Sequence, residues 1–301
     1  MSVLISGSTG FAGRNLMKYL KDNIGNDEIL PLDLRGSWRG SIDNETTAII
    51  HLAGKAHDLK NAANPDEYYK VNYELTKDLY DAFLQSNAKQ FIFISSVKAA
   101  ADTVTGILNE TMVPQPDTHY GKSKLMAEEY ILYQALPKGK SYFILRPCMI
   151  HGLGNKGNLN LLYQVVKRGV PYPLAGFDNK RSFLSINNLC FIITELIARN
   201  DISSGIYNIA DDEALSTNEV VNILSASLGR KGKLWHISPL FIKFIAKIGD
   251  KLHLPLTTER LNKLTESYVV SNEKIKAALQ KPLPLSAREG LNITALSFKN
   301  S

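Results

Sequence analysis

Tyr120 and Lys124 lie four residues apart in the segment HYGKSKLMAEEY, residues 119–130. On a helix, positions i and i+4 share one face, so the phenol and the ammonium would stand side by side. A tyrosine with its usual pKa of about 10 is a poor base at neutral pH unless a nearby cation stabilises the phenolate. The pair is therefore either a surface contact or a proton-transfer device, and the spacing alone leaves both interpretations open.

A glycine-rich turn near the start of the sequence offers a partner for such a device. The apolar run at residues 3–6 predicts a buried strand, and apolar residues recur at helical spacing from 11 to 20. Between them, GSTGFAG at residues 7–13 carries glycines that let a backbone turn tightly and approach a pyrophosphate at a helix N-terminus. This context predicts a dinucleotide site rather than a turn without a ligand. The glycines are Gly7, Gly10 and Gly13.

Asp33 bears on which dinucleotide binds. It ends the apolar run at residues 28–32 and lies twenty-six residues after Gly7. An acid near this spacing binds the diol of an adenosine ribose and favours NAD. Arg35 is suited instead to a 2′-phosphate, which makes NADP the alternative, and a simple turn role for Asp33 also stays open.

The remaining pattern predicts an α/β fold with a doubly wound parallel sheet, because apolar strands alternate with helices. Ser95 and Ser96 follow one of these strands and fall at the carboxyl edge of the sheet, where ligands bind in such folds. Further strands are predicted at residues 48–52, 90–94 and 142–145, and long helices at 66–85 and 120–136.

Past residue 151 the composition changes, with frequent Gly, Asn and Pro over residues 152–181 and helical patterns beyond. We expect a dinucleotide-binding domain over residues 1–151 and a smaller, mostly helical substrate region over 152–301. Some segments of the second region are expected to return to the sheet.

The bulk composition narrows the functional classes. Net charge is +6 at pH 7, but the charges are spread along the 301 residues, which disfavours a nucleic-acid-binding arm and suits an anionic small molecule. Cys148 and Cys190 are flanked by apolar residues and are expected to be buried thiols. The sequence starts with a strand pattern rather than a signal peptide or membrane span, so the expected location is cytoplasmic. No metal-ligand spacing occurs and no metal is predicted.

Five short motifs, in this order and spacing, give the chain a family resemblance. GSTGFAG, HLAG at 51–54, FISS at 93–96, YGKSK at 120–124 and LRP at 145–147 resemble the extended short-chain dehydrogenase/reductase family. More narrowly, they are similar to its nucleotide-sugar epimerases, dehydratases and 4-keto-reductases. The resemblance implies a Rossmann fold, NAD as cofactor, and a homodimer formed through the two long helices.

The same resemblance implies roles for single residues. It puts the phenolic base on Tyr120, its lysine partner on Lys124, a substrate-binding and catalytic hydroxyl on Ser96, and a helix-bending asparagine on Asn72. Beyond the glycines, Asp33, Arg35, Tyr120 and Lys124, it implies cofactor contacts from Thr9, Phe11, Ala12, Leu52, Ala53, Gly54 and Pro147.

Within the family, a dehydratase is disfavoured. The 4,6-dehydratases of the group carry an Asp-Glu pair directly after the hydroxyl residue, whereas this chain has Val97-Lys98. A 4-epimerase and a 4-keto-reductase share one catalytic set, so both stay open, with a UDP-hexose or UDP-N-acetylhexosamine as the expected substrate. A reductase of an apolar ketone and a non-enzymatic dinucleotide sensor are the alternatives.

Substrate and adenine contacts are less well marked. The resemblance implies Asn158 and Arg181 against a diphosphate, with Arg260 as a further candidate. Residues 34–48 leave little room for a full crossover helix, and Asp43 is the stand-in for the acid that usually contacts adenine.

Residues 234–254 predict an amphipathic, basic helix after Pro239. Packing within the substrate region is the favoured interpretation. Docking on a membrane surface, which would fit a lipid-linked glycan substrate or pathway, is the less favoured alternative.

Overall fold

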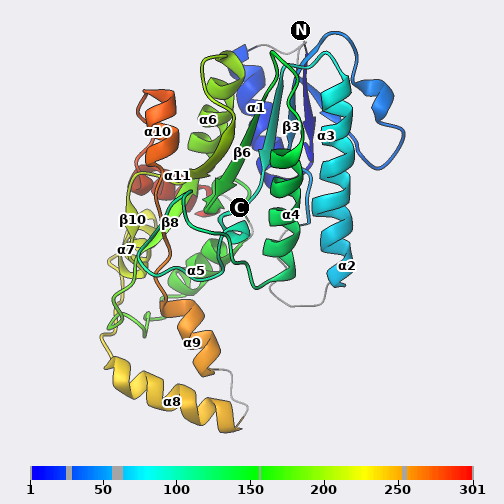
Figure 1. The fold of residues 1–301 in the computed structure, drawn as a ribbon. Helices are drawn as coiled ribbons and strands as arrows, with labels where there is room; N and C mark the ends of the chain where they lie inside the picture. The colour runs from blue at the N-terminus through cyan, green and yellow to red at the C-terminus, as the bar shows by residue number, and fades with distance from the viewer. Residues whose placement is uncertain (1, 25–28, 56–63, 156, 253–255, 300–301) are drawn as a thin grey trace.

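The computed structural model describes residues 2–24, 29–55, 64–155, 157–252 and 256–299. Its centre is a six-stranded parallel sheet with the order β2-β1-β3-β4-β6-β9 (Figure 1). This confirms the predicted α/β fold with a doubly wound sheet. The strands are β1 (Ser2–Ser6), β2 (Ile29–Leu32), β3 (Thr46–His51), β4 (Gln90–Ile94), β6 (Ser141–Pro147) and β9 (Gly205–Ile209).

Alternate residues of each strand face opposite layers of helices, because side chains along a strand point to the two faces in turn. In β1, Val3 and Ile5 belong to the core beneath α1 (Phe11–Ile24) and α6 (Ile186–Ala198). Leu4 belongs to the core beneath α3 (Leu75–Gln85) and α4 (His119–Tyr133) on the other face. Strands buried on both faces explain the nearly continuous apolar runs in the sequence.

The connection from β2 to β3 lacks an α-helix, as the short sequence predicts. Residues 33–45 contain only the 3₁₀ turn η1 (Arg39–Ser41), and the two strands flank β1 on opposite sides. The predicted helix over residues 66–85 is present but composite. It runs through α2 (Pro65–Tyr68), the π-helical turn η2 (Tyr69–Glu74) and α3.

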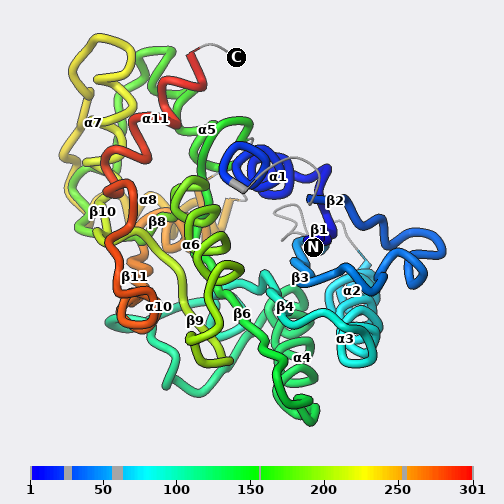
Figure 2. Tube along the Cα trace, turned by 90° about the horizontal axis from the view of Figure 1, so that it is seen from above, coloured from blue at the N-terminus to red at the C-terminus, as the bar shows by residue number. Residues whose placement is uncertain are grey.

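The substrate-side region combines short strands with the predicted helices. One small sheet has the order β10-β8-β7, and a second pairs β11 with β5. In Figure 2, α5, α7 and α11 lie beside one another around a separate core that includes Leu159, Leu224 and Leu291. The elements are β5 (Ile107–Leu108), β7 (Met149–His151), α5 (Asn158–Lys167), β8 (Arg181–Ser185), β10 (Ala214–Leu215), α7 (Thr217–Ser227), α8 (Pro239–Leu252), α9 (Thr258–Thr265), β11 (Val269–Val270), α10 (Glu273–Leu279) and α11 (Ala287–Lys299), with the 3₁₀ turn η3 at Val97–Ala99.

This region and the main sheet are interleaved. Strand β9 lies beyond residue 151 yet pairs with β6 in the main sheet, whereas β7 precedes residue 152 and pairs with β8. The domain boundary at residue 151 therefore stays a prediction. Both cysteines, Cys148 and Cys190, are buried thiols as expected.

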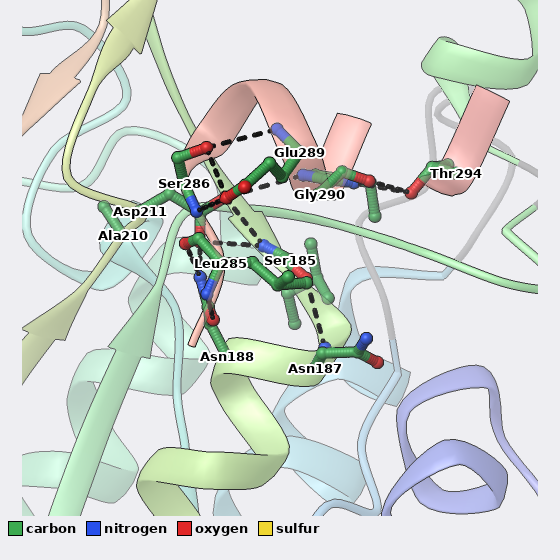
Figure 3. Close-up of polar contacts among 12 residues, drawn as sticks. Ser185, Asn187, Asn188, Ala210, Asp211, Leu285, Ser286, Glu289, Gly290 and Thr294 are labelled. Atoms are coloured by element: carbon green, nitrogen blue, oxygen red, sulfur yellow. Dashed lines mark hydrogen bonds and ion pairs between the residues drawn. The ribbon is translucent and has the colours of Figure 1, made fainter. Parts of the chain in front are cut away.

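A buried polar junction holds the two parts together (Figure 3). The Asp211 carboxylate, just after β9, accepts hydrogen bonds from the Ser185 amide at 3.0 and 3.1 Å and from Asn188 Nδ2 at 2.7 Å. Asn188 in turn exchanges hydrogen bonds with the backbone of Leu285, just before α11. One carboxylate thus organises the ends of β8 and β9 and the starts of α6 and α11.

Candidate active site

The glycine loop packs so tightly that side chains are excluded. Gly7 has a φ of +71°, and a Cβ there would lie 2.6 Å from the Ala53 amide nitrogen. A Cβ on Gly13 would lie 2.2 Å from the Gly7 carbonyl oxygen, which itself accepts the Gly10 amide at 3.0 Å. The N-terminus of α1 can therefore come close to a bound phosphate group, as the motif predicts.

A cavity of about 710 Å³ opens against this loop and is large enough for part of a dinucleotide. Its walls come from the loop, the end of β2 and the turn after β3. They include the predicted contacts Gly7, Thr9, Gly10, Asp33, Arg35, Leu52, Ala53 and Gly54. The cavity and the glycine cradle fit the expected NAD.

Asp33 and Arg35 both line this cavity and bind each other. Arg35 Nε and Nη2 lie 2.9 and 2.8 Å from the two oxygens of Asp33, and the guanidinium lowers the pKa of that carboxyl to about 2. Asp33 is therefore an ionised acceptor, as a ribose diol requires. Asp43 does not line this cavity. Its carboxylate instead accepts from the Glu45 amide and the Thr46 hydroxyl, so its suggested adenine role is not supported.

A second cavity, of about 250 Å³, contains the predicted catalytic set. Ser96, Tyr120 and Lys124 line it together with Ala12 and Pro147. Leu52 and Gly54 line both cavities, so the reaction site adjoins the end of the dinucleotide site. Phe11 begins α1, next to the glycine loop, but is not among the lining residues of either cavity.

Gly121, between the tyrosine and the lysine, has a packing role. Helix α4 is capped by Thr118, whose hydroxyl accepts the Gly121 amide at 3.1 Å. A Cβ on Gly121 would lie 2.4 Å from the Lys98 carbonyl oxygen. Glycine therefore lets the first turn of α4 approach the turn that follows Ser96, and Ser96 reaches Tyr120.

The Tyr120 and Ser96 side chains line this cavity together. Burial raises the pKa of Tyr120, and the neighbouring Ser96 side chain partly offsets that rise. Lys124 is not among the groups that shift the pKa of this phenol here, so the prediction that it makes Tyr120 acidic stays a prediction. The Lys124 ammonium donates to the Ile94 carbonyl at 2.9 Å and lies 4.7 Å from the Phe93 ring centre, while burial lowers its pKa to about 8.

Asn72 supports the loop between the two cavities. It lies in the π-helical turn, where its Oδ1 accepts the Lys55 amide at 2.8 Å. Its Nδ2 donates to the Lys55 carbonyl at 3.2 Å and to Ser123 Oγ at 3.1 Å. The π-helical turn places this amide against residues 54 and 55.

The sequence analysis missed the support beneath the site. Ser95, a neighbour of the catalytic candidate, donates to the buried Glu128 carboxylate. Glu128 also forms a buried, bidentate ion pair with Arg146, whose Nε lies 3.0 Å from Oε1. Both serines line the cavity, but the Ser95 hydroxyl is already engaged by Glu128. Arg146 could have been marked by its position in an otherwise apolar strand.

The structure does not gather the predicted substrate residues at the reaction cavity. Asn158 is exposed at the start of α5, and Arg260 is exposed on α9. Arg181 donates from Nε to the Glu266 carbonyl at 3.1 Å and from Nη2 to the Lys263 carbonyl, at the end of α9. The three substrate contacts stay predictions.

Two features are missing from the part of the chain that the structure describes. No group of three or more His, Cys, Asp or Glu side chains there is arranged to hold a metal ion. None of the described helices combines the length and apolar character needed to cross a bilayer.

Fold and site together define a dinucleotide-dependent enzyme. Residues 3–210 match the profile of the NAD dependent epimerase/dehydratase family, and the chain belongs to that family. It is accordingly an enzyme with NAD as its cofactor. The resemblance to nucleotide-sugar epimerases and dehydratases is confirmed.

The chain is also similar to individual proteins of known sequence and structure. The chain is 30% identical to a UDP-glucose 4-epimerase of Vibrio cholerae over 99% of its own length and 95% of the relative. It is 29% identical to an N-acetyl-alpha-D-glucosaminyl-diphospho-ditrans,octacis-undecaprenol 4-epimerase of Escherichia coli O157:H7, over 78% of this chain and 75% of that one. In fold it resembles a Bacillus cereus UDP-glucuronic acid 4-epimerase solved with NAD, with a TM-score of 0.77, 17% identity and coverage of 100% and 99%.

Proposed function

We propose that this enzyme is a nucleotide-sugar 4-epimerase that inverts C4 of a UDP-hexose or UDP-N-acetylhexosamine. The observation that carries the proposal is that Ser96, Tyr120 and Lys124 line one cavity, which adjoins the dinucleotide cavity through Leu52 and Gly54. The near full-length similarity to a UDP-glucose 4-epimerase supports epimerisation over reduction.

The chain's residues would divide the chemistry as follows. Ser96 holds the C4 oxygen, and the Tyr120 phenolate accepts the C4 hydroxyl proton and later returns it. Bound NAD supplies a hydride acceptor that can give the hydride back to the opposite face of C4. Lys124 keeps an ammonium charge at the cavity wall, which stabilises the charge that develops on the phenol.

The residues after Ser96 support this choice against a dehydratase. Val97 is aliphatic and buried, and the Lys98 ammonium donates to the Asp102 carbonyl at 2.6 Å. The two positions therefore supply no carboxyl group to protonate a leaving hydroxyl. In contrast, inversion at C4 needs only one proton acceptor and donor, which Tyr120 provides.

Assays with UDP-glucose and UDP-N-acetylglucosamine test the reaction directly. We expect conversion to the C4 epimer without added coenzyme, since hydride returns to the same substrate. Stoichiometric consumption of added NADPH would instead identify a 4-keto-reductase. Absence of UDP binding together with reduction of an apolar ketone would overturn the substrate class.

Tyr120→Phe tests the proton-transfer role. The variant keeps the ring but lacks the hydroxyl, so we expect turnover to fall about 10²- to 10⁴-fold with NAD binding and the unfolding midpoint little changed. Tyr69→Phe, which changes a half-buried phenol that contacts His119, is the matched control. Equal rates for wild type and Tyr120→Phe would exclude the mechanism.

A homodimer and a cytoplasmic location stay proposals. Helix α4 exposes Met126, Leu132 and Tyr133, which supports an interface through the two long helices. Light scattering measures the molar mass in solution, and a homodimer should show twice the mass of one chain.

A further inference from the structure

Helix α8 exposes an apolar face that the proposed chemistry does not use. Ile242, Ala246 and Gly249 form a buried stripe, and the first two pack in one core with Leu174 and Leu261. The favoured prediction of packing within the substrate region is therefore right for this stripe. Five further apolar side chains on the helix are between 37% and 79% exposed: Leu240, Phe241, Phe244, Ile248 and Leu252.

These exposed residues form one continuous surface. At about 100° per residue, they span an arc of about 120° around the helix axis, beside the buried stripe. Lys243 and Lys247 lie beyond the other border of this arc, and Lys251 lies just inside that border. The geometry is that of an interfacial helix, in which an apolar face enters the lipid and lysines reach toward the headgroups.

The charge on this surface is positive and is not balanced locally. No ion pair within the described residues involves the three lysines. The single acid on the helix, Asp250, accepts from the Thr258 amide at 2.9 Å and from its hydroxyl at 2.5 Å, so it serves as a cap for α9. An anionic partner surface would complement the lysines.

The position of α8 suits a planar partner. Figure 1 shows α8 as an outlying element, placed with α9 beyond the carboxyl ends of the main strands. Arg181 ties the end of α9 to β8 through the Glu266 carbonyl. A surface bound to α8 would therefore lie on the side of the molecule where the carboxyl ends of the main strands are found.

We propose that α8 binds the surface of a membrane that contains anionic phospholipids, with its axis in the plane of the interface. Phe241, Phe244 and their apolar neighbours enter the boundary between headgroups and acyl chains, and the lysines contact lipid phosphates. At 14 residues the helix is too short to span the hydrocarbon core. The proposal does not depend on which sugar the enzyme uses.

Sedimentation of the full chain with vesicles tests this directly. We expect binding to vesicles of phosphatidylglycerol and phosphatidylcholine at about 0.1 M salt, and weaker binding at about 0.5 M salt or to phosphatidylcholine alone. The double variant Phe241→Ser/Phe244→Ser should lower the partition coefficient about tenfold or more. Val113→Ser, which removes a 77% exposed apolar side chain elsewhere, is the matched control and should bind as wild type does.

The lysines have their own variant. Lys243→Gln/Lys247→Gln/Lys251→Gln should lose about tenfold or more in binding to the anionic vesicles and little in binding to phosphatidylcholine. Replacing the exposed Lys21, Lys89 and Lys299 by Gln removes the same net charge and should change binding much less. Because all of these side chains are exposed, turnover in solution should be retained.

Two results would overturn the proposal. One is equal vesicle binding by wild type and the double Phe variant. The other is no vesicle binding by wild type, with light scattering showing that the double Phe variant dissociates an oligomer. That second outcome would assign the face to a contact between copies of this chain.

Discussion

Lys124 is held in an environment that disfavours its own charge. Its side chain is 5% exposed, and burial lowers its pKa from the usual 10.5 to about 8, with Glu128 acting in the opposite direction. A structural lysine would more often pair directly with a carboxylate. This one instead donates to the Ile94 carbonyl at the edge of the reaction cavity, which fits a group retained for chemistry rather than stability.

The depressed pKa predicts a specific pH dependence of stability. Between about pH 8 and 10.5 the unfolded state binds a proton that the folded state lacks, so the free energy of unfolding should rise with pH in that window. Below about pH 8 Lys124 is protonated in both the folded and the unfolded state, so the folded state carries the full cost of burying the ammonium charge. In Lys124→Met this rise should disappear, a difference of up to about 3 kcal/mol across the window.

Urea unfolding of wild type and Lys124→Met at several pH values measures this difference directly. Other titrating groups are common to both proteins, so they cancel in the comparison. Parallel curves for the two proteins would show that Lys124 has an ordinary pKa in the folded state.

At the scale of single elements, close backbone approach decides how helices begin. Helix α1 and helix α4 each start where a glycine allows contact with a carbonyl oxygen, at Gly13 against Gly7 and at Gly121 against Lys98. Helix propensity favours alanine over glycine by about 1 kcal/mol, so these positions act against local preference. Gly13 thereby lets the N-terminus of α1 lie near the dinucleotide cavity, and Gly121 lets α4 bring Tyr120 close to Ser96.

Gly13→Ala should therefore destabilise the protein, although propensity predicts the opposite. The added methyl would overlap the Gly7 carbonyl at 2.2 Å, and relieving that overlap should cost about 1–3 kcal/mol and weaken NAD binding. At Gly36 a Cβ would meet nothing within 4 Å, so Gly36→Ala should change stability by less than about 0.5 kcal/mol. Thermal unfolding and NAD titration calorimetry measure both effects, and a more stable Gly13→Ala would contradict the packing argument.

For the whole molecule, the junction around Asp211 couples the sheet to the substrate-side region. Its buried carboxylate accepts three hydrogen bonds from two residues of another segment. The substrate-side core around α5, α7 and α11 has its own apolar contacts, and this polar junction links it to the main sheet.

Asp211→Ala should cost about 3 kcal/mol of stability, because it leaves the Ser185 amide without an acceptor and removes one of the two acceptors of Asn188 Nδ2. Hydrogen exchange should increase most at the starts of α6 and α11, with smaller changes in β1 and β3. Asp201→Ala, which removes an exposed partner of Arg199, should cost less than about 1 kcal/mol. Similar losses in the free energy of unfolding for the two variants would mean that the Asp211 junction contributes no more to stability than an exposed ion pair.

Much of the fold and part of the site could be predicted from the sequence, because the relevant interactions are local. The glycine loop lies directly between one strand and one helix, and the four-residue spacing of Tyr120 and Lys124 puts them on one face of α4. Strand Gln90–Ile94 was predicted with its observed bounds, since a buried parallel strand has an apolar side chain at nearly every position.

What only the tertiary structure decided depends on residues far apart in the sequence. The buried Glu128–Arg146 pair joins a helix to a strand eighteen residues later, and the Ser95 hydroxyl donates to the Glu128 carboxylate of that pair. The direction of the Lys124 ammonium and the division of α8 into a buried stripe and an exposed apolar face likewise depend on what packs nearby. A local pattern specifies which side of a helix is apolar, whereas burial and electrostatic environment are set by neighbours that only the folded chain brings together.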